Sequence, residues 1–396
     1  MITVACRLSV SVTVAGSLIA AGSSSGQVRM LGAMGDSLTD EYAEESYDYA
    51  TNWTMQIVQH RSIDMGPNAA EANQPGGTWG EPRRTGFWAN WARYGADSAT
   101  AITDGQHTGL AAQVGIGGVS HAVIELGTND FSPTTSAYLN IYFGFWSQSQ
   151  IDSYVNARVA NIRTIVETVR PTGAGILLCN YVDFGPAPAT RQFFSNASRR
   201  DRITAVLARV NAEVEEIARQ NHAVLVDLNR LGTVIMGTNG ALRQFMPIGN
   251  VNIQLFNRDT ASHANPLAGF VDDGAHPHTS LQGIFANVMM TALNSGWGSS
   301  YTRFTDAEIL ANAGITYGGT DTLDVVVAPY SQYIRSYLCP GDLDFDQTVS
   351  TADLVVMLGN FGLAIQPGTG GDVNADGVVN TADLVAFLDD FGSVCP

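Results

Sequence analysis

Residues 28–40 have the sequence VRMLGAMGDSLTD. The first seven of them form a mainly apolar run of strand length that ends in small residues. Thr39 and Asp40 favour the start of a helix. The stretch therefore predicts a strand, a tight turn around Gly35, and Ser37 at the exit of the strand. Hydrolases place a nucleophile on a turn of this kind, although Gly, Asp and Ser also form ordinary turns.

Apolar strands alternate with amphipathic helices along most of the chain. Further strands are expected near 121–126, 174–179 and 222–227, and helices over 52–61, 151–169, about 200–220 and about 280–293. Strands that are apolar throughout predict a parallel sheet covered by helices on both faces. In such sheets ligands bind beyond the carboxyl ends of the strands. The serine turn and the Gly127–Asp130 turn both follow strands, so both are expected at this edge.

One long loop is expected near the serine. Residues 62–85 are rich in Gly, Pro and Asn and contain Trp79. Long loops without secondary structure of their own often shape a substrate cleft.

The composition excludes several classes of protein. The 396 residues carry a formal net charge of −17, and all 20 basic residues are Arg. Such a surface repels nucleic acid and anionic membranes. With 45% apolar and 14% charged residues the chain is not of the disordered class. Its length allows one large domain and one small domain.

Residues 1–26 have the pattern of an export signal. Arg7 is the only charged residue, and an apolar run from Leu8 to Ala21 is followed by small residues. The run is short and rich in Ser, Thr and Gly, which disfavours a membrane anchor. The pattern predicts a secreted or cell-surface protein with no membrane span.

The cysteines divide into two kinds. Cys339 and Cys395 bracket the last segment, which suggests one disulfide in an exported protein. Cys179 lies in an apolar, strand-like run and is expected to be a buried free thiol.

A second chemical signal lies far along the chain, in residues 271–278, VDDGAHPH. An Asp three residues before a His can orient the imidazole through its Nδ1–H and leave Nε2 to take a proton from a serine. A serine hydroxyl needs such a base because it is a poor nucleophile when protonated. Asp272 and His278 offer alternative pairings, but the spacing favours Asp273 with His276.

Four short blocks occur in a defined order along the chain. They are Gly35-Asp36-Ser37-Leu38, Asn90-x-Ala-x-x-Gly95, Gly127-x-Asn129-Asp130 and Asp273-x-x-His276. Over about residues 28–295 the chain resembles the SGNH (GDSL-type) hydrolases, a superfamily of esterases and lipases. The resemblance implies a three-layer α/β/α fold with a flavodoxin-like parallel sheet. The segment between Ser37 and Gly95 is long for this family.

The resemblance also implies roles for individual residues. Ser37 is expected to be the nucleophile, His276 the general base and then acid, and Asp273 the carboxylate that orients His276. The oxyanion hole corresponds to the backbone N–H groups of Ser37 and Gly95 and the side-chain amide of Asn129. Asp36 is expected to brace the turn. No cofactor is implied for catalysis.

The end of the chain contains two copies of one pattern, which start 30 residues apart at Gly341 and Gly371. Oxygen ligands at loop positions 1, 3, 5 and 12, with a backbone carbonyl at position 7, form a calcium loop. The expected ligands are Asp342, Asp344, Asp346, Thr348 and Asp353 in the first loop, and Asp372, Asn374, Asp376, Val378 and Asp383 in the second.

This tail resembles a dockerin-like module, which pairs two calcium loops with two helices. The resemblance implies a small α-helical domain with two structural Ca²⁺ ions and a partner such as a cohesin; attachment to the cell surface is the alternative. Both loops use Asp at position 12. Gln347 replaces the turn glycine of the first loop, so the first site is expected to be the weaker one.

The chain is therefore expected to contain an export signal (1–26), an SGNH hydrolase domain (27–330), a linker (331–338) and a dockerin-like module (339–396). A strand is expected over 322–327. The predicted function is that of a secreted serine esterase, with acetyl groups on a polysaccharide as the first candidate substrate. A lipase or general short-chain esterase is the alternative. A binding protein without catalysis is a third hypothesis, which the filled triad positions disfavour.

Overall fold

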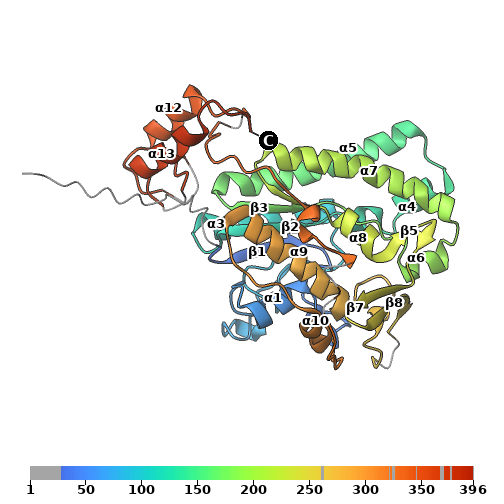
Figure 1. Cartoon of the computed structure of the whole chain (residues 1–396). Helices are drawn as coiled ribbons and strands as arrows, with labels where there is room; N and C mark the ends of the chain where they lie inside the picture. Colours follow the sequence, from blue (N-terminus) through green and yellow to red (C-terminus); the bar gives the residue numbers. More distant parts are fainter. Residues whose placement is uncertain are drawn as a thin grey trace, which may run out of the picture.

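The computed structural model describes residues 28–259, 263–320, 322, 326–344, 346–365, 370–374 and 377–395. The expected export signal (1–26) and Asp376 lie outside these residues, as does half of the strand expected over 322–327. A central sheet lies between two layers of helices (Figure 1). Its described strands follow the order β1-β2-β3-β4-β10. Their bounds are Leu31–Gly35, His121–Glu125, Gly175–Cys179, Val224–Val226 and Ile334–Ser336.

Strands β1 to β4 are parallel, as the apolar runs predicted. Residues 89–93 extend the sheet beyond β1. Ala33 N–H donates to Ala89 O at 2.9 Å, and Trp91 N–H donates to Ala33 O at 2.8 Å. This segment occupies the place that the second strand has in a flavodoxin-like order, so the predicted topology agrees with the structure.

The far edge of the sheet differs from the expectation. Residues 334–336, inside the segment expected to be a linker, form β10, which pairs antiparallel with β4. Arg335 lies within ion-pair distance of Glu215 (2.7 Å), which adds a charged contact to the pairing. A strand of three residues carries too little pattern to be recognised in a sequence.

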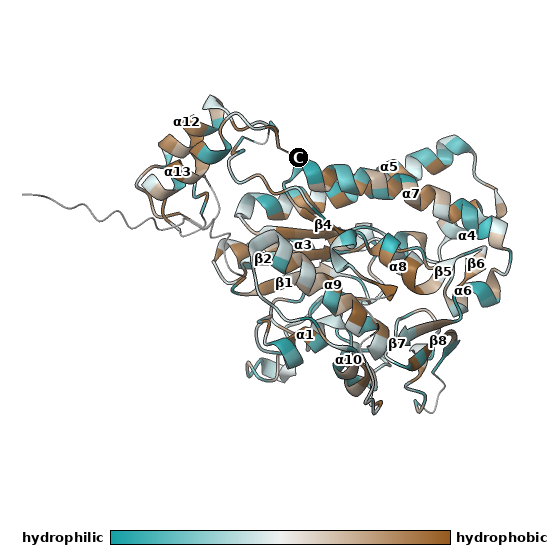
Figure 2. Cartoon of the chain, in the orientation of Figure 1, coloured by the Kyte–Doolittle hydropathy of each residue, from teal (hydrophilic) through white to brown (hydrophobic). Residues whose placement is uncertain are grey.

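Two helical layers cover the faces of the sheet. Helices α1 (Trp53–Arg61) and α9 (Thr279–Trp297) share one apolar core with Leu31, Val123 and Leu177. Helices α3 (Gln106–Gly115), α5 (Gln148–Val169) and α7 (Ala197–Gln220) share the other core. Successive residues of a strand point to opposite faces of the sheet, so the strands contribute side chains to both cores. Figure 2 shows the apolar strands between helices that have one apolar and one polar side. The helices expected near 52–61, 151–169, 200–220 and 280–293 correspond to α1, α5, α7 and α9.

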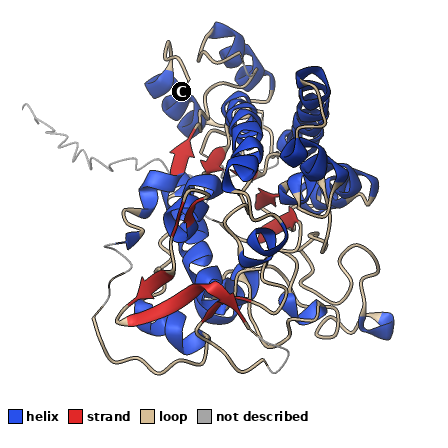
Figure 3. Cartoon of the chain, turned by 90° about the vertical axis from the view of Figure 1, so that its right-hand side faces the viewer, coloured by secondary structure: helices blue, strands red, loops and turns tan. Residues whose placement is uncertain are grey.

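Several shorter elements were not expected. They include the helices α2 (Ser98–Thr103), α4 (Ser136–Phe143), α6 (Pro188–Phe193), α8 (Leu228–Met236) and α10 (Asp306–Asn312). A separate sheet contains β7 (Phe245–Ile248), β8 (Val251–Arg258) and β9 (Ala268–Phe270), and β5 (Gly237–Thr238) pairs with β6 (Ala241–Leu242). Figure 3 shows the β7–β9 sheet apart from the central one. Strand β9 leads directly into the loop that carries Asp273 and His276.

The tail forms a small domain of its own, with helices α12 (Thr351–Gly359) and α13 (Thr381–Asp390) (Figure 1). The disulfide between Cys339 and Cys395 closes it, with the two Cα atoms 5.7 Å apart. Cys179 is a buried free thiol, as predicted. Among the described residues, no helix combines the length and the apolar run needed to cross a membrane.

The tail contacts the large domain at the amino-terminal edge of the sheet. Nε2 of His222, two residues before β4, lies 3.0 Å from Oδ2 of Asp342. The guanidinium of Arg219 donates to the side-chain oxygen of Gln347. Ser37 and Asn129 lie at the opposite, carboxyl-terminal edge, because each follows the end of a parallel strand. The tail is therefore placed away from these residues.

Candidate active site

The turn after β1 holds Ser37 in a buried position, with 6% of the residue exposed. Asp36 Oδ1 accepts the N–H of Leu38 at 3.0 Å, so Asp36 does brace the turn. A Cβ at Gly35 would lie 2.2 Å from the backbone oxygen of Glu125, which leaves room for glycine alone. Burial raises the pKa of Asp36 to about 7 and that of Glu125 well above its ordinary value.

The loop after β9 brings Asp273 and His276 to this serine. His276 Nε2 lies 2.6 Å from Ser37 Oγ, and His276 Nδ1 is hydrogen-bonded to Asp273 Oδ2. Asp273 Oδ1 accepts the backbone N–H groups of Ala275 (2.8 Å) and His276 (3.0 Å). The three side chains thus form one hydrogen-bonded chain across residues more than 230 positions apart.

Electrostatics favour the ionised form of Asp273. Burial opposes ionisation, but the hydrogen bond and charge of His276, together with the two backbone donors, outweigh it and lower the pKa of Asp273 to about 2. The carboxylate is thus charged at neutral pH and accepts the Nδ1–H of His276. Nε2 is left facing the serine hydroxyl, which is the arrangement that lets an imidazole take the serine proton.

The alternative residues have other partners. The backbone N–H of Asp272 donates to the hydroxyl of Tyr49 at 3.0 Å. His278 is the N-cap of α9, where its Nδ1 accepts the N–H of Thr279 at 2.8 Å. Nε2 of His278 lies 3.5 Å from Asp259. The structure therefore pairs Asp273, and not Asp272, with His276.

The residues expected to form the oxyanion hole line the same cavity as Ser37. Gly95 has a φ of +76°, a conformation that favours glycine. The side-chain amide of Asn129 donates one N–H to Ala96 O at 3.0 Å, which ties Asn129 to the Gly95 segment. A side-chain amide has a second N–H, which remains available for a substrate oxygen.

Asp130 explains why an acid follows Asn129 in the motif. It is almost fully buried and accepts hydrogen bonds from Tyr181 (2.9 Å) and Ser98 (3.0 Å), and it pairs with Arg158 at 3.2 Å. Burial raises its pKa to about 6 despite these partners. These contacts hold the Asn129 turn to helix α2, to helix α5 and to the loop after β3.

The cavity above Ser37 has a volume of about 410 Å³. Ser37, His276, Gly95 and Asn129 supply polar atoms to its wall. The rest of the wall is largely apolar and includes Phe131, Tyr138, Val182, Phe184, Phe193, Ile203 and Leu207. Both the size and the mixture of apolar walls with a few polar groups are typical of a small-molecule site.

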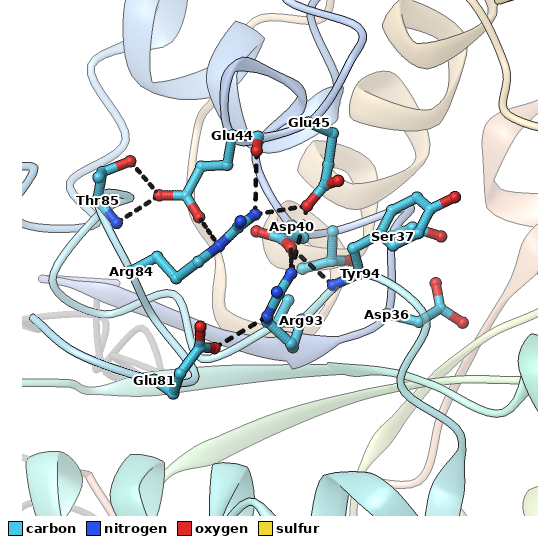
Figure 4. A network of polar contacts seen from close by, with 12 residues as sticks. Asp36, Ser37, Asp40, Glu44, Glu45, Glu81, Arg84, Thr85, Arg93 and Tyr94 are labelled. Carbon is cyan, nitrogen blue, oxygen red and sulfur yellow. Dashed lines mark hydrogen bonds and ion pairs between the residues drawn. The ribbon is translucent and has the colours of Figure 1, made fainter. Parts of the chain in front are cut away.

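A network of charged residues surrounds the start of the Gly95 segment (Figure 4). Asp40 Oδ2 accepts the backbone N–H of Tyr94 at 2.7 Å, and Arg93 lies 3.6 Å from the same carboxylate oxygen. Arg93 also pairs with Glu45 (3.2 Å) and Glu81 (3.0 Å). Burial raises the pKa of Asp40 to about 7.

The same network ties down the loop over residues 62–85. Arg84 pairs with Glu44 (3.1 Å) and Glu45 (2.5 Å), and the backbone N–H of Thr85 donates to Glu44 at 2.6 Å. The loop is thus anchored to the turn behind Ser37, which contains Glu44 and Glu45 (Figure 4). Asp40 lies close to the Gly35–Leu38 block, and Arg93 lies within the Asn90–Gly95 block. Beyond these positions, no sequence signal indicates the long-range pairs.

Three tyrosines around His276 were also missed. The ring centroids of Tyr42, Tyr47 and Tyr94 lie 6.3, 5.2 and 5.5 Å from that of His276. The hydroxyl of Tyr47 donates to Asp273 Oδ2 at 3.0 Å. Tyr94 is next to Gly95 in the sequence, but nothing in the sequence distinguishes Tyr47 from other turn residues.

In the tail, the carboxylates of Asp342, Asp344 and Asp353 lie together, with oxygen atoms within 4.8 Å of one another. The two loops contain equivalent hydrogen bonds from the backbone to their first aspartate. Asp342 Oδ2 accepts the N–H of Gln347 (2.8 Å), as Asp372 Oδ2 accepts that of Gly377 (2.7 Å). Gln347 has a φ of +72°, so it adopts the conformation for which glycine was expected.

The fold and the site together place Ser37, His276 and Asp273 in one hydrogen-bonded chain at the carboxyl edge of a parallel sheet, an arrangement typical of hydrolases. Residues 31–289 match the family model described as GDSL-like lipase/acylhydrolase. The chain belongs to this family, and it is a carboxylic ester hydrolase. A comparison with curated proteins finds no match.

Several solved structures are similar to the chain at low sequence identity. An acetylxylan esterase from Geobacillus stearothermophilus has 15% identity and a TM-score of 0.38, covering 69% of this chain and 98% of that chain. A GDSL-like lipase from Bacteroides thetaiotaomicron has 14% identity and a TM-score of 0.35, covering 67% and 88%. The esterase EstA from a Pseudoalteromonas species has 14% identity and a TM-score of 0.35, covering 67% of this chain and 97% of that chain.

Proposed function

We propose that the chain is an exported serine esterase in which Ser37 attacks the carbonyl carbon of an ester. The hydrogen-bonded chain from Ser37 through His276 to Asp273 is the observation that supports this most strongly. As Ser37 Oγ bonds to the carbonyl carbon, its proton passes to His276 Nε2. The negative charge on the carbonyl oxygen is met by the N–H groups of Ser37 and Gly95 and by the amide of Asn129.

The intermediate then collapses with loss of the alcohol. His276 gives its proton to the leaving oxygen, and an acyl group remains on Ser37. Water next attacks the acyl carbon while His276 takes one of its protons. When the second intermediate collapses, the acid leaves and the proton returns to Ser37 Oγ. Asp273 keeps the imidazole oriented and stabilises its charged form through both steps.

The nucleophile is tested by Ser37→Ala, with Ser132→Ala as a control serine on the wall of the same cavity. With p-nitrophenyl acetate, kcat of Ser37→Ala should fall by about 10⁴- to 10⁶-fold, because the whole triad acts through this atom. Ser132→Ala should retain activity. An organophosphate ester should label Ser37, as read by peptide mass. Wild-type activity in Ser37→Ala, or a label on another residue, would contradict the assignment.

For the substrate we propose an acetyl group carried by a polysaccharide. An exported hydrolase with a docking module at its end is suited to an insoluble polymer. The tail contacts the large domain at the amino-terminal edge of the sheet, so such docking leaves the cavity accessible.

A lipase or general short-chain esterase is the second candidate, and the apolar cavity favours it. Its volume of about 410 Å³ far exceeds the space that an acetyl group requires, and apolar side chains such as Ile203 and Leu207 lie on its wall. Aryl esters of graded acyl length, measured beside acetate release from acetylated xylan, separate the two candidates. A higher kcat/KM for chains of eight or more carbons, without acetate release from xylan, would exclude the acetylesterase.

We further propose that the tail binds two Ca²⁺ ions. The donor set fits the ion, because Asp342, Asp344 and Asp353 supply hard carboxylate oxygens close together. Asp346 and the carbonyl of Thr348 would complete the first loop, and Asp372, Asn374, Asp383, the carbonyl of Val378 and Asp376 would form the second. Bound calcium would order the two loops and offset the mutual repulsion of their carboxylates.

The tail also has the surface expected of a docking module. Apolar side chains recur 30 positions apart on its two halves and are exposed: Val355 and Val385, Leu358 and Leu388, Phe361 and Phe391. Repeated exposed apolar patches of this kind are typical of protein interaction sites. We propose a cohesin-like domain or a cell-surface protein as the partner, and secretion or surface attachment as the location.

A further inference from the structure

The imidazole of His276 lies against the rings of three tyrosines, Tyr42, Tyr47 and Tyr94. Tyr47 is the central one, since its ring lies nearest to His276 (5.2 Å between centroids) and also contacts the rings of Tyr42 and Tyr94. Tyr47 is 6% exposed. It packs in a small apolar cluster with Tyr42, Met55 and Val271.

The hydroxyl of Tyr47 makes a contact that packing alone does not require. It donates to Asp273 Oδ2 at 3.0 Å, and the same oxygen accepts the Nδ1–H of His276. Since the single hydroxyl proton of Tyr47 is used in this bond, the contact between Tyr94 and Tyr47 at 3.4 Å has Tyr94 as the donor. The hydrogen bonds therefore run from Tyr94 through Tyr47 to Asp273.

We propose that Tyr47 is a positioning residue of the catalytic machinery, which acts through Asp273 on His276. The inference rests on the proposed roles of Ser37, His276 and Asp273. Two backbone N–H groups hold Oδ1 of Asp273, and Tyr47 supplies the only side-chain donor besides His276 that is seen at Oδ2 among the described residues. Tyr47 thereby limits rotation of the carboxylate and takes up part of its negative charge.

The Tyr47 hydroxyl keeps its proton, and so remains a donor, at neutral pH. Burial, with the nearby carboxylate of Asp273, raises the pKa of Tyr47 well above its usual range. The other titratable groups near the Asp273–His276 pair include Asp36 from the turn after β1, Tyr42 from the turn that follows it, and Tyr94 beside Gly95. Asp272 in the same loop and Tyr49, which feels the charges of Asp272 and Asp273, also belong to this group. A Tyr47→Phe variant leaves all of these groups in place.

Removing the hydroxyl has two expected consequences. The carboxylate loses a donor, so more negative charge is left to stabilise the protonated imidazole. The acidic limb of the pH profile of kcat/KM should then move to higher pH. The carboxylate is also freer to rotate, so the imidazole is less well oriented and kcat should fall while KM, which depends on contacts in the cavity, stays nearly unchanged.

The experiment compares Tyr47→Phe with Tyr49→Phe. Tyr49 is a fair control because its hydroxyl bonds the backbone N–H of Asp272, in the same loop, without touching the triad. With p-nitrophenyl acetate, Tyr47→Phe should lose about 10- to 150-fold in kcat, as expected for one hydrogen bond to a charged group. Its acidic limb should move upward by several tenths of a pH unit. Tyr49→Phe should show the wild-type profile.

A double variant tests whether Tyr47 acts through Asp273. In an Asp273→Asn background, Tyr47→Phe should have little further effect on kcat, because the carboxylate is absent. An unchanged acidic limb in Tyr47→Phe, or an equal loss of kcat in the Asp273→Asn background, would overturn the inference. If either of these outcomes is found while Ser37→Ala abolishes activity in the same assays, only the role of Tyr47 is overturned. If Ser37→Ala stays active, the proposed function fails instead.

Discussion

At the scale of single residues, the side chains of the site are held in place by contacts with the rest of the protein. Asn129 shows this most directly, because one N–H of its amide is bound to Ala96 O. The turn that carries it is fixed by Gly127, where a Cβ would lie 2.0 Å from the ring of Tyr181. A donor that is already oriented stabilises developing charge without reorganisation during the reaction.

Asn129→Ala should lower kcat by about 10²- to 10³-fold, as expected for the loss of one oxyanion donor. KM should change little, since the carbonyl oxygen gains most of its charge after binding. Steady-state kinetics with aryl acetates measure both constants. The Ser132→Ala variant is again the control. A kcat within about threefold of wild type would remove Asn129 from the oxyanion hole.

At the scale of elements, the long loop over 62–85 is part of the support of the site. Arg84 and Glu81 link this loop to the turn behind Ser37 and to Arg93. Arg93 and Asp40 in turn hold the segment that leads into Gly95. The extra length between Ser37 and Gly95 is therefore used to brace the backbone of the expected oxyanion hole (Figure 4).

Asp40→Ala should lower both kcat and the melting temperature. The substitution leaves the N–H of Tyr94 without its acceptor in a region that is mostly buried, which costs about 1–3 kcal/mol. It also loosens the Gly95 segment. Asp40→Asn keeps an acceptor oxygen and should stay much closer to wild type in both measurements. Equal effects of the two substitutions would show that the charge of Asp40, and not its hydrogen bond to Tyr94, is what matters.

At the scale of the whole molecule, the cavity that holds Ser37 and the small carboxyl-terminal domain lie at opposite edges of one sheet. The tail reaches the large domain through His222 and Arg219, near the start of β4. The cavity opens at the carboxyl ends of the strands. A small domain of this size has a limited apolar core, here centred on Met357 and Phe387, and the disulfide adds to its stability. The proposed calcium ions would add further support.

Removal of calcium should destabilise the tail and leave ester hydrolysis unchanged. A ligand at 100 times its dissociation constant adds about 2.7 kcal/mol to the stability of the folded form. A chelator should therefore lower the melting transition of the tail in calorimetry, and kcat on aryl acetates should stay constant. An Asp353→Asn, Asp383→Asn double variant, measured in calcium, should resemble the chelated protein. A tail transition that does not respond to chelator would contradict the metal sites.

The sequence by itself was sufficient for the parallel sheet, for the serine turn and for four of the five helices in the two covering layers; α3 was not expected. These follow from local signals: apolar runs, helical spacing and the glycine required at position 35. The structure brings Ser37, Asn129, Asp273 and His276, the residues singled out by the ordered blocks, to one cavity. The choice between Asp272 and Asp273 was favoured by spacing, and the structure agrees with it because His278 is used as the cap of α9.

Only the tertiary structure shows β10, the charged network around Arg93 and the tyrosines around His276. Each depends on contacts between residues far apart in sequence, such as Tyr47 with Asp273, and local patterns carry no information about such pairs. The cavity volume likewise results from walls supplied by several separate elements. The serine turn therefore follows from nearby residues, whereas the surroundings that orient its partners follow from the packing of the whole domain.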